Sequence, residues 1–331
     1  MDQRFSYRRS QVVQINGVNS ESANVISGIP QGSVLGPLLF VVYINDLLDN
    51  INSTGLLFAD DTKIFRKITS EDDAKLLQQD IALLEEWSKI WLLKFNADKC
   101  HVLTMGKFEN IRHTARYKIC NEEMEHVGSE KDLGVTFDEN LRFEEHIANK
   151  VRIANAIVGQ IRRSFTFLDG ETFRRLYTAL VRPHLEYAQA VWSPYLAKHI
   201  NMIERVQIRA TKLVDGMGNM EYEERLRQLK LPTLKYRRKR GDMIEVFKHH
   251  NAYDKQALCP TFEPRQRITR NNSRKVTERI PKDGSYGCQT NSFYYRTTRV
   301  WNELPDLVVS AVSLDAFKNK LDEHWEAQLY T

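Results

Sequence analysis

The stretch Gly55-Leu56-Leu57-Phe58-Ala59-Asp60-Asp61-Thr62-Lys63-Ile64-Phe65 sets the first expectation for the fold. Two short apolar runs, Leu56–Ala59 and Ile64–Phe65, flank the adjacent aspartates Asp60 and Asp61. This order predicts a strand–turn–strand hairpin with both carboxylates at its tip. Adjacent carboxylates repel each other and lose hydration, and a divalent cation relieves that cost because Mg²⁺ takes hard oxygen ligands. The alternative is a plain surface turn, since aspartate is common in turns.

About thirty residues upstream lies the segment SGIPQGSVLGP, residues 27–37. Its three glycines and two prolines predict a shaped loop with exposed backbone N–H groups. The apolar residues 37–51 that follow predict a buried helix with proline in its first turn. Gln31 and Ser33 can form hydrogen bonds with a sugar or a base, whereas the alternative is an ordinary loop that enters a helix.

Together these two segments resemble the palm of reverse transcriptases, specifically those of non-LTR (LINE-type, CR1/jockey-like) retrotransposons. Residues 94–100, KFNADKC, resemble the next palm motif of that family. Residues 130–147 resemble its hairpin that grips the primer end, and residues 174–194 and 292–325 resemble its C-terminal region. The resemblance therefore covers nearly the whole chain.

The resemblance implies RNA-directed DNA polymerisation by two-metal nucleotidyl transfer, with an RNA template, a DNA primer and deoxynucleoside triphosphates as partners. Asp60 and Asp61 would hold Mg²⁺ or Mn²⁺. Lys99 would protonate the leaving pyrophosphate, and its alternative is a solvated lysine before a strand. The pocket for the incoming nucleotide and template would be shaped by Pro30, Gln31, Gly32, Ser33 and Phe58.

One element of the family pattern is not found in this sequence. The family carries another catalytic aspartate upstream of the PQGS loop, in a segment resembling F-D-(F or L)-x-K-A-F-D. Residues 1–26 contain only the acids Asp2 and Glu21, and neither lies in that context. The fingers and an endonuclease domain are missing as well. We therefore expect weak metal binding, no efficient polymerisation by the chain alone, and an N-terminally truncated element copy or a fragmentary gene model.

Charge is distributed unevenly along the 331 residues, although the net charge is only +5. Residues 1–149 have a net charge of −7, and residues 150–275 have a net charge of +14. A basic region of this size predicts a polyanionic partner, and the alternative is a solvated helical surface. The predicted nucleic-acid-binding residues are Arg162, Arg163, Arg174, Arg175, Lys235, Arg237, Arg238, Lys239 and Arg240. The run from Lys235 to Arg240 is also typical of nuclear localisation signals.

Composition excludes several classes of protein. Four scattered cysteines without a CxxC pair argue against a disulfide framework and a structural zinc site. The longest apolar run, Val34–Ile44, is too short to cross a bilayer, so no membrane partner is expected. We expect an intracellular protein of the nucleus or cytoplasm.

The pattern predicts an α+β fold, with a partial polymerase palm (an antiparallel sheet with helices) followed by an all-α thumb-like region. The predicted domains are a palm with a primer-grip-like hairpin at 1–149, a basic helical region at 150–254, and a mobile basic segment with a C-terminal helix at 255–331. Further expectations are a hairpin over 11–29, a helix that begins at a Ser70/Asp73 capping box, a strand over 95–105, a helix that stops at Pro183, and a final helix capped by Ser313. Trp192 and Trp301 are expected in the core.

Two functions of different classes follow from these features. The first is a reverse-transcriptase-family polypeptide, impaired by the absent upstream aspartate. The second is a non-catalytic nucleic-acid-binding remnant of a mobile element that uses only residues 150–275. An inert product is a third possibility that the sequence does not separate from the others.

Overall fold

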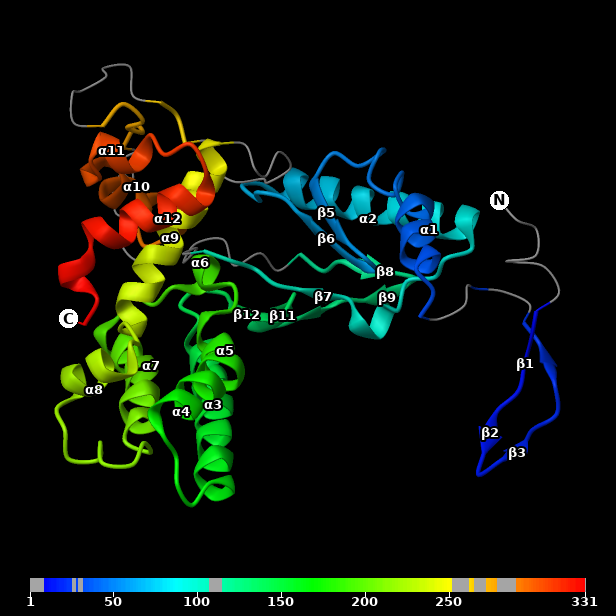
Figure 1. Ribbon diagram of the computed structural model, residues 1–331. Helices are drawn as coiled ribbons and strands as arrows, with labels where there is room; N and C mark the ends of the chain where they lie inside the picture. The colour runs from blue at the N-terminus through cyan, green and yellow to red at the C-terminus, as the bar shows by residue number, and fades with distance from the viewer. Residues whose placement is uncertain are drawn as a thin grey trace. The chain divides into compact units, whose positions relative to one another are not determined.

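The computed structural model describes residues 9–25, 28, 32–106, 115–251, 262–264, 272–278 and 290–330 (Figure 1). These residues form a mixed α+β protein in which helices predominate and each sheet has two strands. The predicted α+β class is confirmed at this level. Contacts divide the chain into a first unit, Met1–Val102 with Phe108–His126, and a second unit, Leu103–Lys107 with Val127–Thr331. The three functional domains expected from the sequence stay predictions.

The first unit begins with two short antiparallel pairings. Strand β1 (Ser10–Gln11) pairs with β4 (Ala23–Asn24), and β2 (Gln14–Ile15) pairs with β3 (Val18–Asn19). Asn16 and Gly17 connect β2 to β3 with positive φ angles of 50° and 82°, as a tight hairpin turn requires. The predicted hairpin is confirmed up to Asn24, whereas residues 26, 27 and 29–31 lie outside the described residues.

Helix α1 (Leu35–Tyr43) is shorter and less buried than predicted. Its end at Tyr43 is followed by a series of turns, and Ile44 and Leu47 in those turns are buried. The prediction of a buried helix is wrong for Leu38, Val41 and Val42, which are exposed in the described part of the chain. The apolar run is hydrophobic all round, but only one side of the helix meets a core.

The predicted hairpin over residues 55–65 is confirmed. Strand β5 (Thr54–Phe58) pairs antiparallel with β6 (Asp61–Phe65), and alternate residues face inward. The inward residues Leu57 and Ile64 pack against a core that contains Leu84 and Trp87. The hairpin therefore has one covered face and one exposed face.

Helix α2 (Glu71–Trp91) provides this support and begins at the predicted capping box, with both reciprocal Ser70–Asp73 hydrogen bonds present. Its buried Asp80 accepts hydrogen bonds from the backbone N–H groups of Asn52 (2.9 Å) and Ser53 (2.8 Å). These bonds attach the residues just before β5 to α2, so the helix holds the hairpin in position.

The prediction of a continuous strand over residues 95–105 is wrong. The chain instead forms a 3₁₀ turn, η2 (Ala97–Lys99), because the N–H of Cys100 donates to the carbonyl of Ala97 rather than to a neighbouring strand. The strand in this stretch is β7 (His101–Val102), which pairs in parallel with β10 (Glu125–His126). A short hairpin of β8 (Lys118–Ile119) and β9 (Glu122–Glu123) lies between them in the sequence.

The second unit begins with the hairpin β11 (Ser129–Asp132) and β12 (Val135–Asp138) and continues with helices. Pro183 does not stop a helix as predicted. It lies in the first turn of α5, a position that accepts proline, and a π-helical turn, η3, joins α4 to α5. The helices up to residue 229 are α3 (Glu144–Ser164), α4 (Gly170–Leu176), η3 (Tyr177–Val181), α5 (Arg182–Glu186), α6 (Gln189–Trp192), α7 (Ala197–Thr211) and α8 (Tyr222–Leu229).

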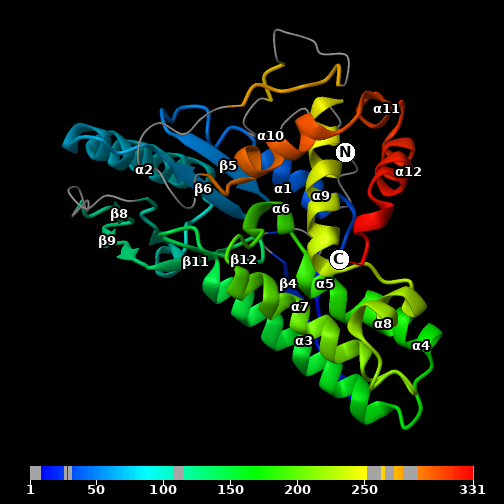
Figure 2. The same ribbon diagram turned by 90° about the vertical axis from the view of Figure 1, so that its left-hand side faces the viewer.

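The C-terminal part of the second unit packs around α9, as Figure 2 shows. The predictions for Trp192 and Trp301 are confirmed, since both side chains are at most 1% exposed. Ser313 caps the last long helix as expected. The predicted mobile segment 255–290 falls largely outside the described residues. The helices here are α9 (Leu234–His250), α10 (Phe293–Glu303), α11 (Asp306–Val309), α12 (Leu314–His324) and the 3₁₀ turn η4 (Glu326–Gln328).

Candidate functional site

The tip of the β5–β6 hairpin presents the two predicted catalytic aspartates. Phe58 and Asp61 form the last cross-strand pair, so Ala59 and Asp60 make a two-residue turn. Ala59 adopts a left-handed conformation with φ of 50°, which lets the chain reverse within that turn. Asp60 and Asp61 are exposed, and the Phe58 side chain is 63% exposed.

Register determines which side chains share a face. Directly paired residues point to the same face of a hairpin, so Asp61 lies beside Phe58, and Leu56 lies beside Lys63 on that exposed face. The tip therefore combines a carboxylate, an aromatic ring and an adjacent turn aspartate. Both aspartates are exposed to solvent.

The donor set at the tip fits part of a magnesium site. Mg²⁺ is commonly held by one or two carboxylates together with substrate phosphates, and Asp60 and Asp61 supply two carboxylates. Among the residues that the structure describes, no group of three or more His, Cys, Asp or Glu side chains is arranged to hold a metal ion. The remaining ligands of a metal at this tip would have to come from elsewhere.

The predicted nucleotide loop is described only in part. Pro30 and Gln31 lie outside the described residues, whereas Gly32 adopts a positive φ of 77°. The hydroxyl of Ser33 accepts a hydrogen bond from the N–H of Gly36 (3.1 Å) at the start of α1. Ser33 thus orders the entry to the helix.

Lys99 ends η2 with an exposed side chain. Its backbone N–H donates to the carbonyl of Asn96 (3.1 Å), which fixes the turn. In the described ranges no hydrogen bond or ion pair joins Lys99 to Asp60 or Asp61. Asp60 and Asp61 are thus adjacent at the tip, and the role that Lys99 would share with them stays a prediction.

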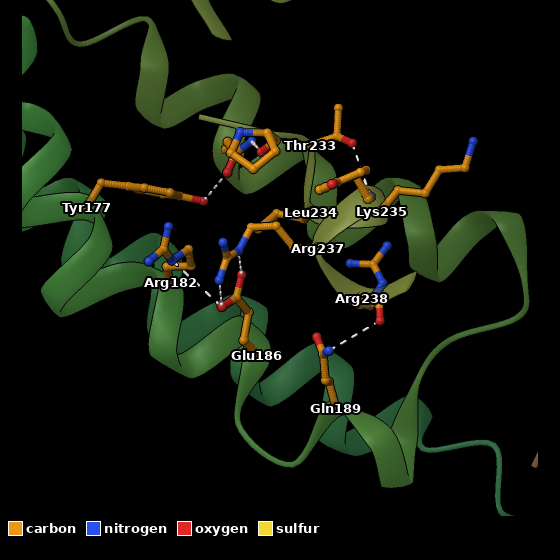
Figure 3. A network of polar contacts seen from close by, with 12 residues as sticks. Tyr177, Arg182, Glu186, Gln189, Thr233, Leu234, Lys235, Arg237 and Arg238 are labelled. Carbon is orange, nitrogen blue, oxygen red and sulfur yellow. Dashed lines mark hydrogen bonds and ion pairs between the residues drawn. The ribbon is translucent and has the colours of Figure 1, made fainter. Parts of the chain in front are cut away.

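The α9 basic run, Lys235–Arg240, lies at the N-terminal half of α9 and is largely paired within the protein. Figure 3 shows Arg237 directed at Glu186 of α5, with Nε and Nη2 on the two carboxylate oxygens and Nη2 at 2.8 Å. Arg182 lies 3.7 Å from the same carboxylate. Arg240 forms a second bidentate pair, with Asp322 of α12, at 2.5 and 2.7 Å.

The other members of the α9 basic run differ in exposure. Arg238 is only 5% exposed, and burial lowers the pKa of its guanidinium. Lys239 lies over the ring of Trp325, with Nζ 4.3 Å from the ring centroid, and it donates to Gln328 (2.9 Å). Lys235 is exposed and extends away from these pairs in Figure 3. Lys235 is therefore the member of the run most open to a phosphate.

The four arginines predicted on earlier helices are all exposed. Arg162 and Arg163 lie in the last turn of α3, and Arg174 and Arg175 lie in the last turn of α4. Arg175 forms a surface ion pair with Glu171 at 2.5 Å. Pairs of this kind contribute little to stability, so they compete weakly with a phosphate.

Helices α3 and α7 pack against each other (Figure 2), and this packing combines basic residues of α7 with those of α3. Lys198 contacts Glu144 at 3.0 Å and Arg209 contacts Asn155 at 3.5 Å, and each pair is 54 residues apart, so the two helices run parallel in register. Residues 146–164 contain no acidic side chain. We define the α3–α7 basic face as the exposed residues Arg152, Arg162, Arg163, Arg205, Arg209 and Lys212.

Sequence reasoning missed Arg152, Arg205, Arg209 and Lys212. A signal was present, because residues 205, 209 and 212 follow the spacing of one helix face. Runs of adjacent arginines and lysines were more conspicuous, but neighbours in a helical sequence point in different directions.

Comparison with known proteins gives a consistent relationship. Residues 3–155 match the family described as reverse transcriptase (RNA-dependent DNA polymerase), a family that typically uses divalent metal ions. The RNA-directed DNA polymerase from mobile element jockey of Drosophila funebris is 30% identical over 219 residues, which cover 62% of this chain and 23% of that protein. The jockey polymerase of Drosophila melanogaster is 26% identical, covering 84% of this chain and 32% of that protein.

A third relative is the probable RNA-directed DNA polymerase from transposon X-element of Drosophila melanogaster, 26% identical over 81% of this chain and 31% of that protein. The chain thus spans about a quarter to a third of the length of these relatives. No solved structure gives a significant match, and no helix in the described ranges is long and apolar enough to cross a membrane. Residues 3–155 therefore belong to the reverse transcriptase family, and the chain is related to part of the polymerases of non-LTR retrotransposons such as jockey and X-element.

Proposed function

We propose that the chain takes part in RNA-directed DNA polymerisation, with residues 1–149 acting as palm and the basic helical region at 150–254 as thumb. The observation that carries this proposal is the exposed tip of the β5–β6 hairpin, where Asp60 and Asp61 stand beside Phe58. The family of residues 3–155 supports it. The partners would be an RNA template, a DNA primer and deoxynucleoside triphosphates.

The chemistry at the tip would be largely positioning and charge neutralisation, as in phosphoryl transfer generally. The primer 3′-hydroxyl would attack the α-phosphate and pyrophosphate would leave. Asp60 would be the main metal ligand and Asp61 its support, and Mg²⁺ or Mn²⁺ bound there would neutralise the triphosphate. Phe58 would contact the nucleotide from the strand, while the loop at residues 30–33 would shape the other side of its pocket. Lys99 would protonate the leaving pyrophosphate.

Efficient polymerisation would need a third carboxylate. In the part of the chain that the structure describes, the tip offers Asp60 and Asp61 without such a group. We therefore expect the purified chain to extend a primed RNA template poorly, and a fusion to the preceding region of the Drosophila funebris jockey polymerase to extend it in Mg²⁺ or Mn²⁺.

The test compares this fusion with matched variants. Asp60→Asn with Asp61→Asn should lower the extension rate at least about 100-fold, because it removes the two carboxylates that would hold the metal ion at the triphosphate. Glu71→Gln with Asp72→Asn changes an adjacent exposed acidic pair in the same unit and should leave the rate unchanged. Extension at the unmodified rate by the Asp60/Asp61 variant would refute the assigned site.

A second candidate function is nucleic-acid binding without catalysis, and the α3–α7 basic face favours it. Five exposed arginines lie on two helices in mutual contact, Lys212 follows directly after α7, and α3 carries no acid beyond Glu145. Such a face binds phosphates with strong salt dependence. In this case an RNA–DNA duplex should bind equally well to the chain and to its Asp60→Asn/Asp61→Asn variant, and the extension assay of the fusion should fail.

A further inference from the structure

The second unit contains a cavity of about 330 Å³ that none of the roles above uses. It lies where the end of β12, the loop before α3, α6 with the residues after it, the C-terminal half of α9 and the start of α10 meet. Figure 2 shows α6, α9 and α10 gathered in this region. The volume falls within the range of small-molecule sites in proteins.

Aromatic side chains supply much of the cavity wall. Phe137, Phe143, Tyr195 and Phe293 all line it. Phe137 and Phe143 meet edge to face with ring centroids 5.6 Å apart, and Phe293 meets His249 in the same way at 6.2 Å. Rings from separate elements that face one space form a suitable surface for a planar ligand, because stacking is favourable on any π face.

Polar groups interrupt this apolar wall at a few points. Glu245 and His249 lie one turn apart on α9 and share a face of the helix. Arg142 and Asn291 line the cavity from the loop and from the residue before the α10 cap. The occupant must therefore present hydrogen-bonding groups at its edge as well as flat apolar faces.

One wall of the cavity is held by Arg296. Its guanidinium pairs with Asp242 of α9 at 2.9 Å through both Nε and Nη2, and Nη2 also donates to the carbonyl of Ala190 (2.7 Å). Nη1 donates to the carbonyl of Asn291 (3.2 Å). A single side chain thus joins α6, α9 and the start of α10, so the wall is set before a ligand arrives.

The opposite loop is fixed by Asp138. Its carboxylate accepts hydrogen bonds from the backbone N–H groups of Asn140 (3.0 Å), Arg142 (3.1 Å) and Phe143 (2.6 Å). Leu141 and Phe143 both have positive φ, 51° and 56°, which costs free energy at residues other than glycine. The carboxylate offsets that cost and keeps Phe143 against the cavity.

We propose that this cavity binds one unstacked guanine base of a single-stranded nucleic acid; this rests on the proposed function, which brings nucleic acid to the chain. Guanine presents two adjacent donors, N1–H and the N2 amino group, to the Glu245 carboxylate, which keeps acceptor positions beside the hydrogen bond that its Oε1 accepts from Lys248 (2.8 Å). It also presents the acceptor O6 to Arg142, and its ring stacks on the aromatic wall. Uracil offers a smaller ring and a single donor, so it fills the cavity less well.

The experiment measures binding of the full chain to two fluorescent nine-nucleotide RNAs by anisotropy at one salt concentration. One RNA is all uridine and the other has guanosine at its centre, so the phosphate contacts are equal. The guanosine RNA should bind about tenfold more tightly, near the lower end of the discrimination that one bidentate contact to a base gives. Replacing guanosine by inosine, which lacks the N2 amino group, should lower this ratio.

Variants locate the effect. Glu245→Gln keeps the size of a half-exposed side chain and should bring the ratio close to one, as should Phe143→Ala. The control Phe167→Ala changes an exposed ring of the same unit that does not line the cavity and should keep the ratio. Equal binding of both RNAs by the unmodified chain, or an unchanged ratio in Glu245→Gln, would overturn the proposal. Asp60→Asn with Asp61→Asn should keep the ratio, which separates this test from that of the polymerase site.

Discussion

Arg237 of α9 forms a bidentate ion pair with Glu186 of α5, in which Nε and Nη2 of the guanidinium contact the two oxygens of one carboxylate. Both side chains are largely buried, at 27% and 20% exposure, and Arg182 approaches Glu186 from its own helix. The two residues are 51 positions apart in the sequence, so the pair connects two separate helices. A residue of a basic run thus acts as an internal connection.

Replacing Arg237 should therefore affect stability more than nucleic-acid binding. Arg237→Ala leaves a partly buried carboxylate without its main partner, and we expect the free energy of unfolding to fall by about 1–3 kcal/mol. Urea unfolding measures this loss. At a temperature where the variant stays folded, its affinity for an RNA–DNA duplex should match that of the unmodified chain. A large loss of affinity without destabilisation would instead show that Arg237 contacts the nucleic acid.

The α3–α7 basic face should show the opposite behaviour. Arg205→Gln with Arg209→Gln removes two exposed cations, so the slope of log affinity against log salt for the duplex should decrease by about 2. Stability should change by less than about 0.5 kcal/mol, because the sites are exposed. Arg227→Gln with Arg299→Gln removes two exposed arginines on other helices, α8 and α10, and serves as the control. Equal slopes for the two double variants would exclude the face as the phosphate contact.

His146 should make stability dependent on pH. It is 1% exposed, lies against Trp192 with ring centroids 5.1 Å apart, and its Nδ1 accepts the N–H of Thr136 (3.1 Å). Burial, with Lys150 nearby, lowers its pKa from 6.5 to about 4. Between these values the unfolded chain binds the proton more readily, so stability is full above pH 6.5 and falls as the pH decreases towards 4.

The expected loss is about 2 kcal/mol between pH 7.5 and pH 5 from His146 alone. His250, stacked on Trp301, has its pKa lowered to about 4 in the same way and adds to the loss. Urea unfolding at the two pH values measures the sum. His146→Gln should reduce the loss of stability between the two pH values by about 2 kcal/mol. His184→Gln, at a partly exposed position, should leave that loss unchanged. An unchanged profile in His146→Gln would contradict the neutral buried imidazole.

Local patterns in the sequence determined the elements that position the candidate catalytic pair. The β5–β6 hairpin and the Ser70/Asp73 start of α2 were predictable because a hairpin turn and a helix cap depend on residues within a few positions of one another. The aspartates at the tip, and the resemblance built on them, came from the same short range. The strand expected over 95–105 and the stop expected at Pro183 failed because a 3₁₀ turn and a π-helical turn depend on backbone hydrogen bonds that composition does not reveal.

Tertiary structure alone decided which basic residues face solvent. The sequence places Lys235–Arg240 in one charged run, but the partners Glu186 and Asp322 lie 51 and 82 residues away from the arginines that they hold. It also leaves Arg152 and Arg209 far apart, although the packing of α3 on α7 places them on one face. The physical reason is that a charge pairs with whatever the fold brings within hydrogen-bond distance, and that distance is a property of packing rather than of neighbours in the chain.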